Sequence, residues 1–231
     1  MNPNVKIFTD TIDLVKTLSN ELKEIINGNP KVNIALSGGS TPSALFTYLA
    51  HFHAADIQWR NANFYWVDER CVPHDHVDSN YGKAMTEFFL KINFPKSQLH
   101  PVDGTNHPTD EAERYSGIIE SNLGKEPLFD LILLGMGDDG HTASIFPNQM
   151  DVLQSKNICE TALHPSLPQH RISLTSYTIN RAKSVVFMVI GKSKASMIRN
   201  VIVDKNKDFP ATHIINTNTK WYLDEAAAAM L

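Results

Sequence analysis

Hydrophobic residues along the chain follow two periods, one helical and one extended. In residues 10–28 the apolar side chains recur every three or four positions, which places them on one face of a helix: Ile12, Val15, Leu18, Leu22, Ile25 and Ile26. Asp10 is a good N-cap for this helix and Gly28 a typical end. Residues 5–8 before it are predicted to form a strand, so the chain opens with a strand and an amphipathic helix.

The same alternation continues along the rest of the chain. Apolar runs that predict further strands are "KVNIALSGG", "NANFYWVDER", "FDLILLG", "RISLT" and "SVVFMVIG". Helical spacing or a helix start signal is found in "TPSALFTYLAHF" with Thr41 as its cap, "SNYGKAMTEFFLK" begun by Ser79, "TDEAERYSGIIESNL" begun by Thr109, a turn from Ser176, and "KSKASMIRNVI". A short apolar segment, "THIIN", follows, and the alanines of "EAAAAML" are predicted to end a helix.

Strands that alternate with helices, several of them apolar on both faces, predict an α/β fold. The expected architecture is a mostly parallel, Rossmann-like sheet flanked by helices on both faces. With 231 residues, 42% hydrophobic and 20% charged, the chain suits a single domain over residues 1–231. Ligands of such sheets bind beyond the carboxyl ends of the strands, so the segments that follow strands are the places to search for a site.

Charge and cysteine content exclude several classes of partner. The net charge is −4 and no run of Lys and Arg occurs, so nucleic-acid binding is not expected. Cys71 and Cys159 form neither a metal-binding spacing nor a disulfide framework. The first ten residues lack the features of a signal peptide, and the apolar runs are too short to cross a membrane. We therefore expect a cytoplasmic protein without membrane contact.

The segment "SGGSTP" carries the first candidate chemistry. Gly38 and Gly39 precede a helix start that contains Ser40 and Thr41, an arrangement that points backbone N–H groups toward an anion at the positive end of a helix. It suits a phosphate, although the same residues also make a good tight turn. No G-K-[ST] follows, so the segment is not a nucleotide-binding P-loop.

Three further segments place charges next to predicted strand ends. Asp68 and Arg70 follow an aromatic strand, and Arg171 and Lys194 lie beside strands in the second half of the chain. Surface charges of this kind are common. At the ligand edge of a sheet, however, the two later cations are placed to neutralise a phosphate held by "SGGSTP".

The segment "LILLGMGDDGHTASIFP" contains G-x-G-x-x-G after a strand, the pattern of a dinucleotide site. It comes late in the chain, and Asp138 and Asp139 lie within it, where carboxylates would repel a diphosphate. The dinucleotide interpretation is therefore disfavoured. What remains is His141 with a carboxylate nearby, which suits a general base, or else a loop histidine that caps the next helix.

Together the motifs "ALSGGSTP", "WVDERCVP…DSNYG", "GMGDDGHTASIFP" and "RISLT…GKSKA" resemble the 6-phosphogluconolactonases of the sugar-phosphate isomerase and deaminase superfamily. The related glucosamine-6-phosphate deaminases share the fold and the D-G-H core but continue with N-E-P, whose glutamate is catalytic. Here Phe146 stands in that glutamate's place. The resemblance therefore favours the lactonase.

The resemblance implies hydrolysis of 6-phospho-D-glucono-1,5-lactone in the pentose phosphate pathway, without metal or organic cofactor. His141 would be the base, oriented by Asp139, although the sequence leaves Asp138 open for this role. Arg70 would contact the substrate and the developing oxyanion. The substrate and its phosphate would lie on Gly38, Gly39, Ser40, Thr41, Asp68, Arg171 and Lys194.

Two other functions stay open at the level of sequence. One is a deaminase or another sugar-phosphate isomerase, which Phe146 disfavours. The other is a sugar-phosphate sensor without catalysis, although we expect no DNA-binding helix pair within these 231 residues. His74 and His76 are interpreted as part of a polar loop, with no metal bound. The expected partner is a small sugar-phosphate lactone, and the expected state is a monomer or homodimer.

Overall fold

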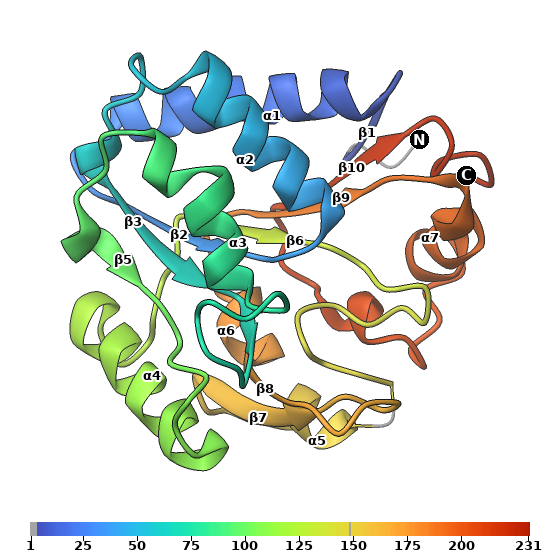
Figure 1. Ribbon diagram of the computed structural model, residues 1–231. Coiled ribbons are helices and arrows are strands. Elements are labelled where there is room, and N and C mark those ends of the chain that lie inside the picture. The colour runs from blue at the N-terminus through green and yellow to red at the C-terminus, as the bar shows by residue number, and fades with distance from the viewer. Residues whose placement is uncertain (1–3, 148) are drawn as a thin grey trace.

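The computed structural model describes residues 4–147 and 149–231 (Figure 1). Within them a seven-stranded sheet has the order β1-β10-β9-β6-β2-β3-β5, and all of its neighbouring strands are parallel. The strands are β1 (Val5–Phe8), β2 (Val32–Leu36), β3 (Ala62–Trp66), β5 (Leu99–His100), β6 (Leu131–Leu134), β9 (Val185–Val189) and β10 (Thr219–Asp224). The predicted mostly parallel α/β fold is confirmed, and parallel pairing brings the carboxyl ends of these strands to one edge.

Helices cover both faces of this sheet, as the sequence predicts (Figure 1). The helices are α1 (Thr11–Gly28), α2 (Ser40–Phe52), α3 (Asn80–Glu87), α4 (Pro108–Leu123), α5 (Met150–Gln154), α6 (Ser176–Asn180) and α7 (Ala195–Ile202). Short 3₁₀ turns lie at 59–61, 89–91, 96–98, 192–194 and 210–213. Asp10 and Ser79 cap α1 and α3 as predicted, since their side chains accept the N–H groups of Asp13 and Gly82.

Two hydrophobic cores result from the alternation of side chains along the strands. Ile34 and Leu133 pack with α1, α2 and α3 on one face, while Ala35 and Leu134 pack with α4, α6 and α7 on the other. Both sets are almost completely buried. Strands β6 and β9 at the centre are uniformly apolar, because each face of the sheet is covered.

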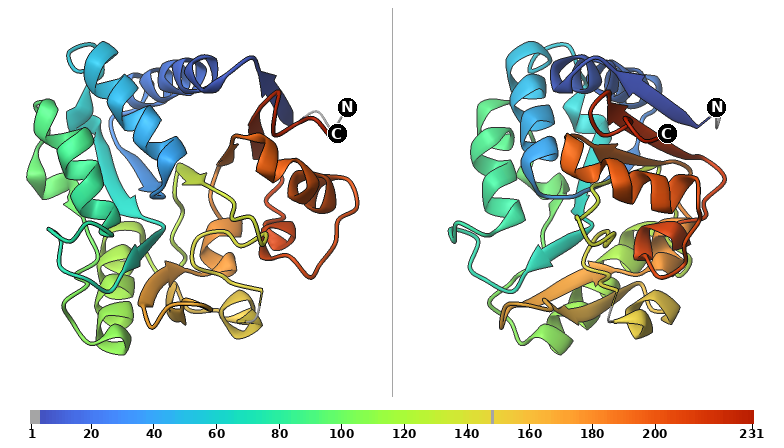
Figure 2. Two further views of the ribbon diagram at one scale, coloured as in Figure 1. Left: turned by 45° about the vertical axis from the view of Figure 1, so that its right-hand side comes forward. Right: turned by 90° about the vertical axis from the view of Figure 1, so that its right-hand side faces the viewer.

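A second, antiparallel sheet has the order β4-β8-β7, from β4 (Asp68–Arg70), β8 (His170–Leu174) and β7 (Cys159–Leu163). It packs beside α4, as Figure 2 shows. The sequence pattern predicted one strand through 61–70. The chain instead leaves the main sheet after Trp66, because β4 finds its partner in β8, about 100 residues further along the chain.

The C-terminal part of the chain departs most from the sequence prediction. Residues 212–216 form no strand, and 225–230 form successive turns where a helix end was expected. The missed strand β10 lies between β1 and β9. Asp224 at its end accepts the N–H groups of Gly191 and Ala227. Within the described residues, none of the helices has both the length and the apolar character needed to cross a membrane.

Candidate active site

A cavity of about 270 Å³ opens at the carboxyl edge of the main sheet, between that sheet and the second one. Its walls come from the segments after β2 and β6, from β4 and β8, from the start of α3, and from the β9–α7 connection. The predicted residues that line it are Gly38, Gly39, Ser40, Thr41, Asp68, Arg70, His141, Arg171 and Lys194. Asp139 joins them through His141. The fold therefore brings together residues that are up to 156 positions apart in the sequence, from Gly38 to Lys194.

The glycine loop after β2 leads straight into α2. The backbone of Gly39 has φ 115°, a conformation that favours glycine, and its carbonyl accepts the N–H of Ser43. A Cβ on Gly38 would lie 1.9 Å from Oδ1 of Asn80, so the loop and α3 approach too closely for any side chain there. The helix begins at Ser40, one residue before the predicted cap Thr41, because Gly39 already serves as the N-cap.

The turn after β6 holds the imidazole of His141. The N–H of Gly137 donates to the carbonyl of His141 over 2.9 Å, and Gly140 closes the turn with φ 77°. A Cβ on Gly137 would lie 2.2 Å from Nδ1 of His141 and 2.5 Å from Oδ1 of Asp139. The glycines of this segment thus make space for a histidine–carboxylate pair.

Asp139 and Asp138 contact different groups. Oδ1 of Asp139 lies 2.6 Å from Nδ1 of His141, whereas Oδ1 of Asp138 lies 2.7 Å from Nζ of Lys194. Burial would raise the pKa of Asp139, but the charge of His141 and its hydrogen bonds outweigh burial and lower that pKa. A carboxylate on Nδ1 favours the tautomer whose Nε2 is free to accept a proton.

Two arginines lie opposite each other on neighbouring strands of the second sheet. Arg70 on β4 pairs directly with Arg171 on β8, and the nearest acid, Asp68, lies 4.0 Å from the Arg171 guanidinium. That carboxylate also accepts the hydroxyl of Ser144 over 2.7 Å. Burial, followed by the charge of Arg70, lowers the pKa of Arg171. Like charges placed opposite each other are unfavourable unless an anion compensates them, so this wall of the cavity favours an anion.

Glu69 is a residue whose role the sequence did not reveal. Its fully buried carboxylate accepts the backbone N–H groups of Arg70, Asn80 and Tyr81 and the hydroxyl of Ser79. Burial raises its pKa although these N–H groups oppose the shift. The side chain therefore ties β4 to the start of α3. The only local signal was the predicted cap Ser79 ten residues later.

Asn80 is a second such residue. Its amide donates to the carbonyl of Asp68 over 2.9 Å and lies against Gly38. It therefore connects β4 to the glycine loop.

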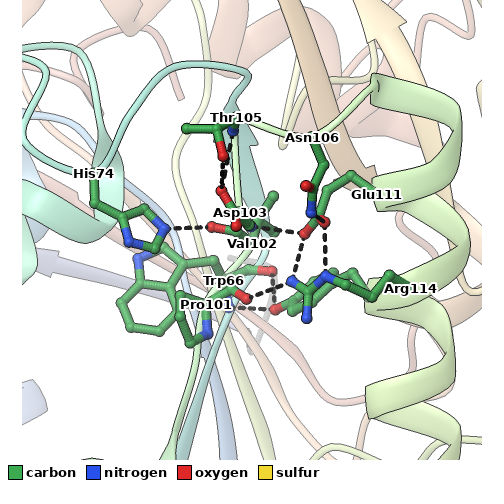
Figure 3. Close-up of polar contacts among 10 residues, drawn as sticks. Trp66, His74, Pro101, Val102, Asp103, Thr105, Asn106, Glu111 and Arg114 are labelled. Atoms are coloured by element: carbon green, nitrogen blue, oxygen red, sulfur yellow. Dashed lines mark hydrogen bonds and ion pairs between the residues drawn. The ribbon is translucent and has the colours of Figure 1, made fainter.

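A contact with the backbone at Val102 supports the loop between β4 and α3. Nε2 of His74 lies 2.7 Å from the carbonyl oxygen of Val102, as Figure 3 shows. The neighbouring Glu111 is buried and accepts the N–H of Asp103, the amide of Asn106 and two nitrogens of Arg114. His74 is therefore engaged with backbone. Within residues 4–147 and 149–231, no cluster of three or more His, Cys, Asp or Glu side chains is arranged to hold a metal ion.

Phe146 occupies the position after the histidine turn where the deaminase motif has its glutamate. The ring is almost fully buried and packs between His141 and His164, with centroids at 4.9 and 5.3 Å. Burial, then Arg171 and His141, lowers the pKa of His164, a residue that the sequence motifs did not single out. The wall behind the candidate base is therefore aromatic and carries no acid at position 146.

The chain is similar to known proteins over most of its length. The family model described as glucosamine-6-phosphate isomerases/6-phosphogluconolactonase matches residues 11–223. The chain is 40% identical over 208 residues to a 6-phosphogluconolactonase of Haemophilus influenzae, covering 88% of this chain and 89% of that one.

Two solved structures are similar to this chain over nearly its full length. The 6-phosphogluconolactonase from Trypanosoma cruzi superposes with a TM-score of 0.87 at 28% identity, covering 100% of this chain and 97% of the other. A monomeric glucosamine-6-phosphate deaminase has a TM-score of 0.85 at 22% identity, covering 99% and 100%. The second likeness concerns the fold alone.

Proposed function

The chain belongs to the family of glucosamine-6-phosphate isomerases and 6-phosphogluconolactonases. From that premise we propose that it hydrolyses 6-phospho-D-glucono-1,5-lactone to 6-phospho-D-gluconate, a step of the oxidative pentose phosphate pathway. The observation that carries this proposal is the Asp139–His141 pair at a cavity rich in anion-binding groups, with Phe146 where a deaminase would need an acid.

His141 acts as the general base. Its Nε2 accepts a proton from water while the water oxygen attacks the lactone carbonyl carbon. Asp139, at Nδ1, stabilises the imidazolium that forms. The tetrahedral intermediate then collapses with cleavage of the bond to the ring oxygen, and the imidazolium returns its proton to that oxygen. The products are the carboxylate, the new hydroxyl and one released proton.

The other groups bind and orient the substrate. Arg70 lies on the same cavity and supplies donors to the carbonyl oxygen as its charge develops. The backbone of Gly38 and Gly39, at the start of α2, receives the phosphate. Its charge is neutralised by Arg171 and Lys194.

The substrate hydroxyls are matched to the remaining lining groups. Ser40 and Thr41 extend the donor set of the glycine loop. Asp68, a carboxylate among donors, accepts substrate hydroxyl groups.

Glucosamine-6-phosphate deamination is the alternative reaction. It would need a second acid, the glutamate of the deaminase motif, and position 146 carries a phenyl ring in contact with His141 instead. A sugar-phosphate sensor without turnover remains the other alternative. We expect the protein to act in the cytoplasm, as a monomer or homodimer, on a small-molecule lactone, without a cofactor.

The test is hydrolysis of the lactone generated in place at near-neutral pH, with the spontaneous opening rate subtracted. We expect wild-type protein to exceed that background clearly. His141→Asn should lower kcat by about 10²- to 10⁴-fold with little change in KM. The matched control is His107→Asn, at the N-cap of α4 outside the cavity, which should keep wild-type kinetics.

Absence of any excess rate from folded wild-type protein would reject the lactonase proposal. Ammonia release from glucosamine 6-phosphate would then be measured, because it supports the deaminase instead. A near-normal kcat in His141→Asn would reject only the assignment of the base.

A further inference from the structure

Lys194, a phosphate-binding residue of the proposed function, is already paired with a carboxylate of its own chain. Its Nζ lies 2.7 Å from Oδ1 of Asp138. The lysine side chain is 19% exposed and lines the cavity, while the Asp138 side chain is 76% exposed and lies at the tip of the histidine turn. The exposed carboxylate of Asp138 therefore pairs with the lysine ammonium at the rim of the cavity.

The other contacts of the turn that carries Asp138 hold His141, the candidate base. Asp139, the next residue, contacts His141, and the backbone of the turn is closed by the bond from Gly137 to His141. Displacing the Asp138 side chain breaks none of these contacts. Its carboxylate can therefore leave Lys194 and return to water while the catalytic pair stays in place.

The interaction energies favour replacement of the Asp138 carboxylate by a phosphate at Lys194. An ion pair with one strongly exposed partner contributes little, because water and salt screen it and the side chains lose freedom when they form it. A phosphate in the cavity would carry up to two negative charges and would meet Arg171 and the N–H groups of the glycine loop as well as Lys194. A carboxylate of Asp138 that stayed near the same ammonium would then repel the phosphate.

We propose that Asp138 competes with the substrate's phosphate for Lys194: its carboxylate pairs with the lysine ammonium and so weakens the binding of phosphate-bearing ligands there. This inference rests on the proposed function, because it assumes that the phosphate lies at Lys194. It assigns opposite effects to two adjacent acids. Asp139 supports the reaction, and Asp138 limits affinity.

The experiment measures binding of inorganic phosphate and of 6-phosphogluconate by titration calorimetry at low ionic strength, independently of turnover. We expect Asp138→Asn to bind both about fivefold more tightly than wild type, the change that corresponds to loss of an exposed ion pair. Added neutral salt should reduce this gain. The same substitution in a Lys194→Ala background should change affinity by less than about twofold, because the competing pair is already gone.

Asp204→Asn is the matched control, since Asp204 forms an exposed ion pair with Arg199 outside the cavity. It should leave phosphate affinity unchanged. Weaker binding by Asp138→Asn would show that the acid positions the lysine and would overturn the proposal. An equal gain in phosphate affinity in the Lys194→Ala background would also overturn it, because the negative charge would then act without involving Lys194.

Failure of this inference and failure of the proposed function give different results. Wild-type protein that binds phosphate but does not hydrolyse the lactone rejects the function and leaves the Asp138 measurement valid. Protein that hydrolyses the lactone with no change of anion affinity in Asp138→Asn rejects only the inference. Absence of anion binding by both proteins would reject the phosphate site and the inference together.

Discussion

A shift of one position along the chain decides which group an acid before His141 contacts. Asp138 and Asp139 are adjacent and chemically identical, yet one contacts a lysine and the other the imidazole. Their separation follows from a tight turn in which Gly137 leaves space beside the imidazole ring. In our proposed mechanism, only the acid on Nδ1 can stabilise the charge that forms on His141 during the reaction.

Asp139→Asn should therefore lower kcat by about 10- to 10²-fold with a small change in KM. The pKa of Asp139 lies below its usual value, so the wild-type carboxylate stays charged throughout weakly acidic solution and can stabilise the imidazolium that forms during the reaction. The neutral amide of the variant cannot do so. Steady-state kinetics of wild type and variant measure the loss of kcat. A wild-type kcat in Asp139→Asn would separate Asp139 from the base.

At the level of elements, the site depends on the junction between β4 and α3. Glu69 joins them by accepting four donors at one buried carboxylate. Because burial raises its pKa, the folded state holds the proton more tightly than the unfolded chain, and ionisation costs stability as pH rises above the ordinary value. The four donors offset that cost and hold the backbone of Arg70 beside the cavity.

Glu69→Gln should disturb this junction, because an amide turns one of its two acceptor atoms into a donor that faces other donors. A buried unsatisfied group costs about 1–3 kcal/mol, so we expect Tm to fall by roughly 3–10 °C. KM should rise as Arg70 and Asn80 shift. Glu113→Gln, at an exposed position of α4, is the control and should change neither quantity. Wild-type Tm in Glu69→Gln would show that the junction does not depend on this carboxylate.

At the scale of the whole molecule, the two ends of the chain meet at one edge of the sheet. β1 pairs with β10, and Glu21 of α1 accepts hydrogen bonds from Lys6 of β1 at 2.8 Å and from the hydroxyl of Tyr222 of β10 at 2.5 Å. Burial would raise the pKa of Glu21, but the bonds from Lys6 and Tyr222 outweigh burial and lower it. The folded state thus favours the charged carboxylate and gains stability from it.

Glu21→Gln should destabilise the protein by about 1 kcal/mol at pH 7. A lowered pKa contributes stability above the unfolded value, and this contribution is lost as pH falls through the folded value. The difference between wild type and variant should therefore shrink below about pH 4. Denaturant unfolding at several pH values measures it. Glu126→Gln, in an exposed pair with Arg181, should show little difference at any pH, and a pH-independent effect of Glu21→Gln would exclude its charge as the cause.

The sequence by itself determined the elements with strong local signals and the segments that line the cavity. Helix α1 follows from its spacing and its cap, β6 from its uniformly apolar run, and the glycine loop and D-G-H turn from their place after strands. These features are local, because helical spacing, a helix cap and an apolar run each involve residues within a few positions of one another in the chain. Parallel topology then brings the strand ends to one edge.

Only the tertiary structure decided the contacts between distant segments. Whether β4 continues β3 or pairs with β8 depends on a partner about 100 residues away, and this pairing places Arg70 opposite Arg171. Strand β10 contains residues that favour strands, but its apolar run is only three residues long, Trp221 to Leu223, and its place between β1 and β9 depends on those distant strands. The different partners of Asp138 and Asp139 depend on side-chain directions within one turn and on the position of Lys194, and residue spacing alone encodes neither.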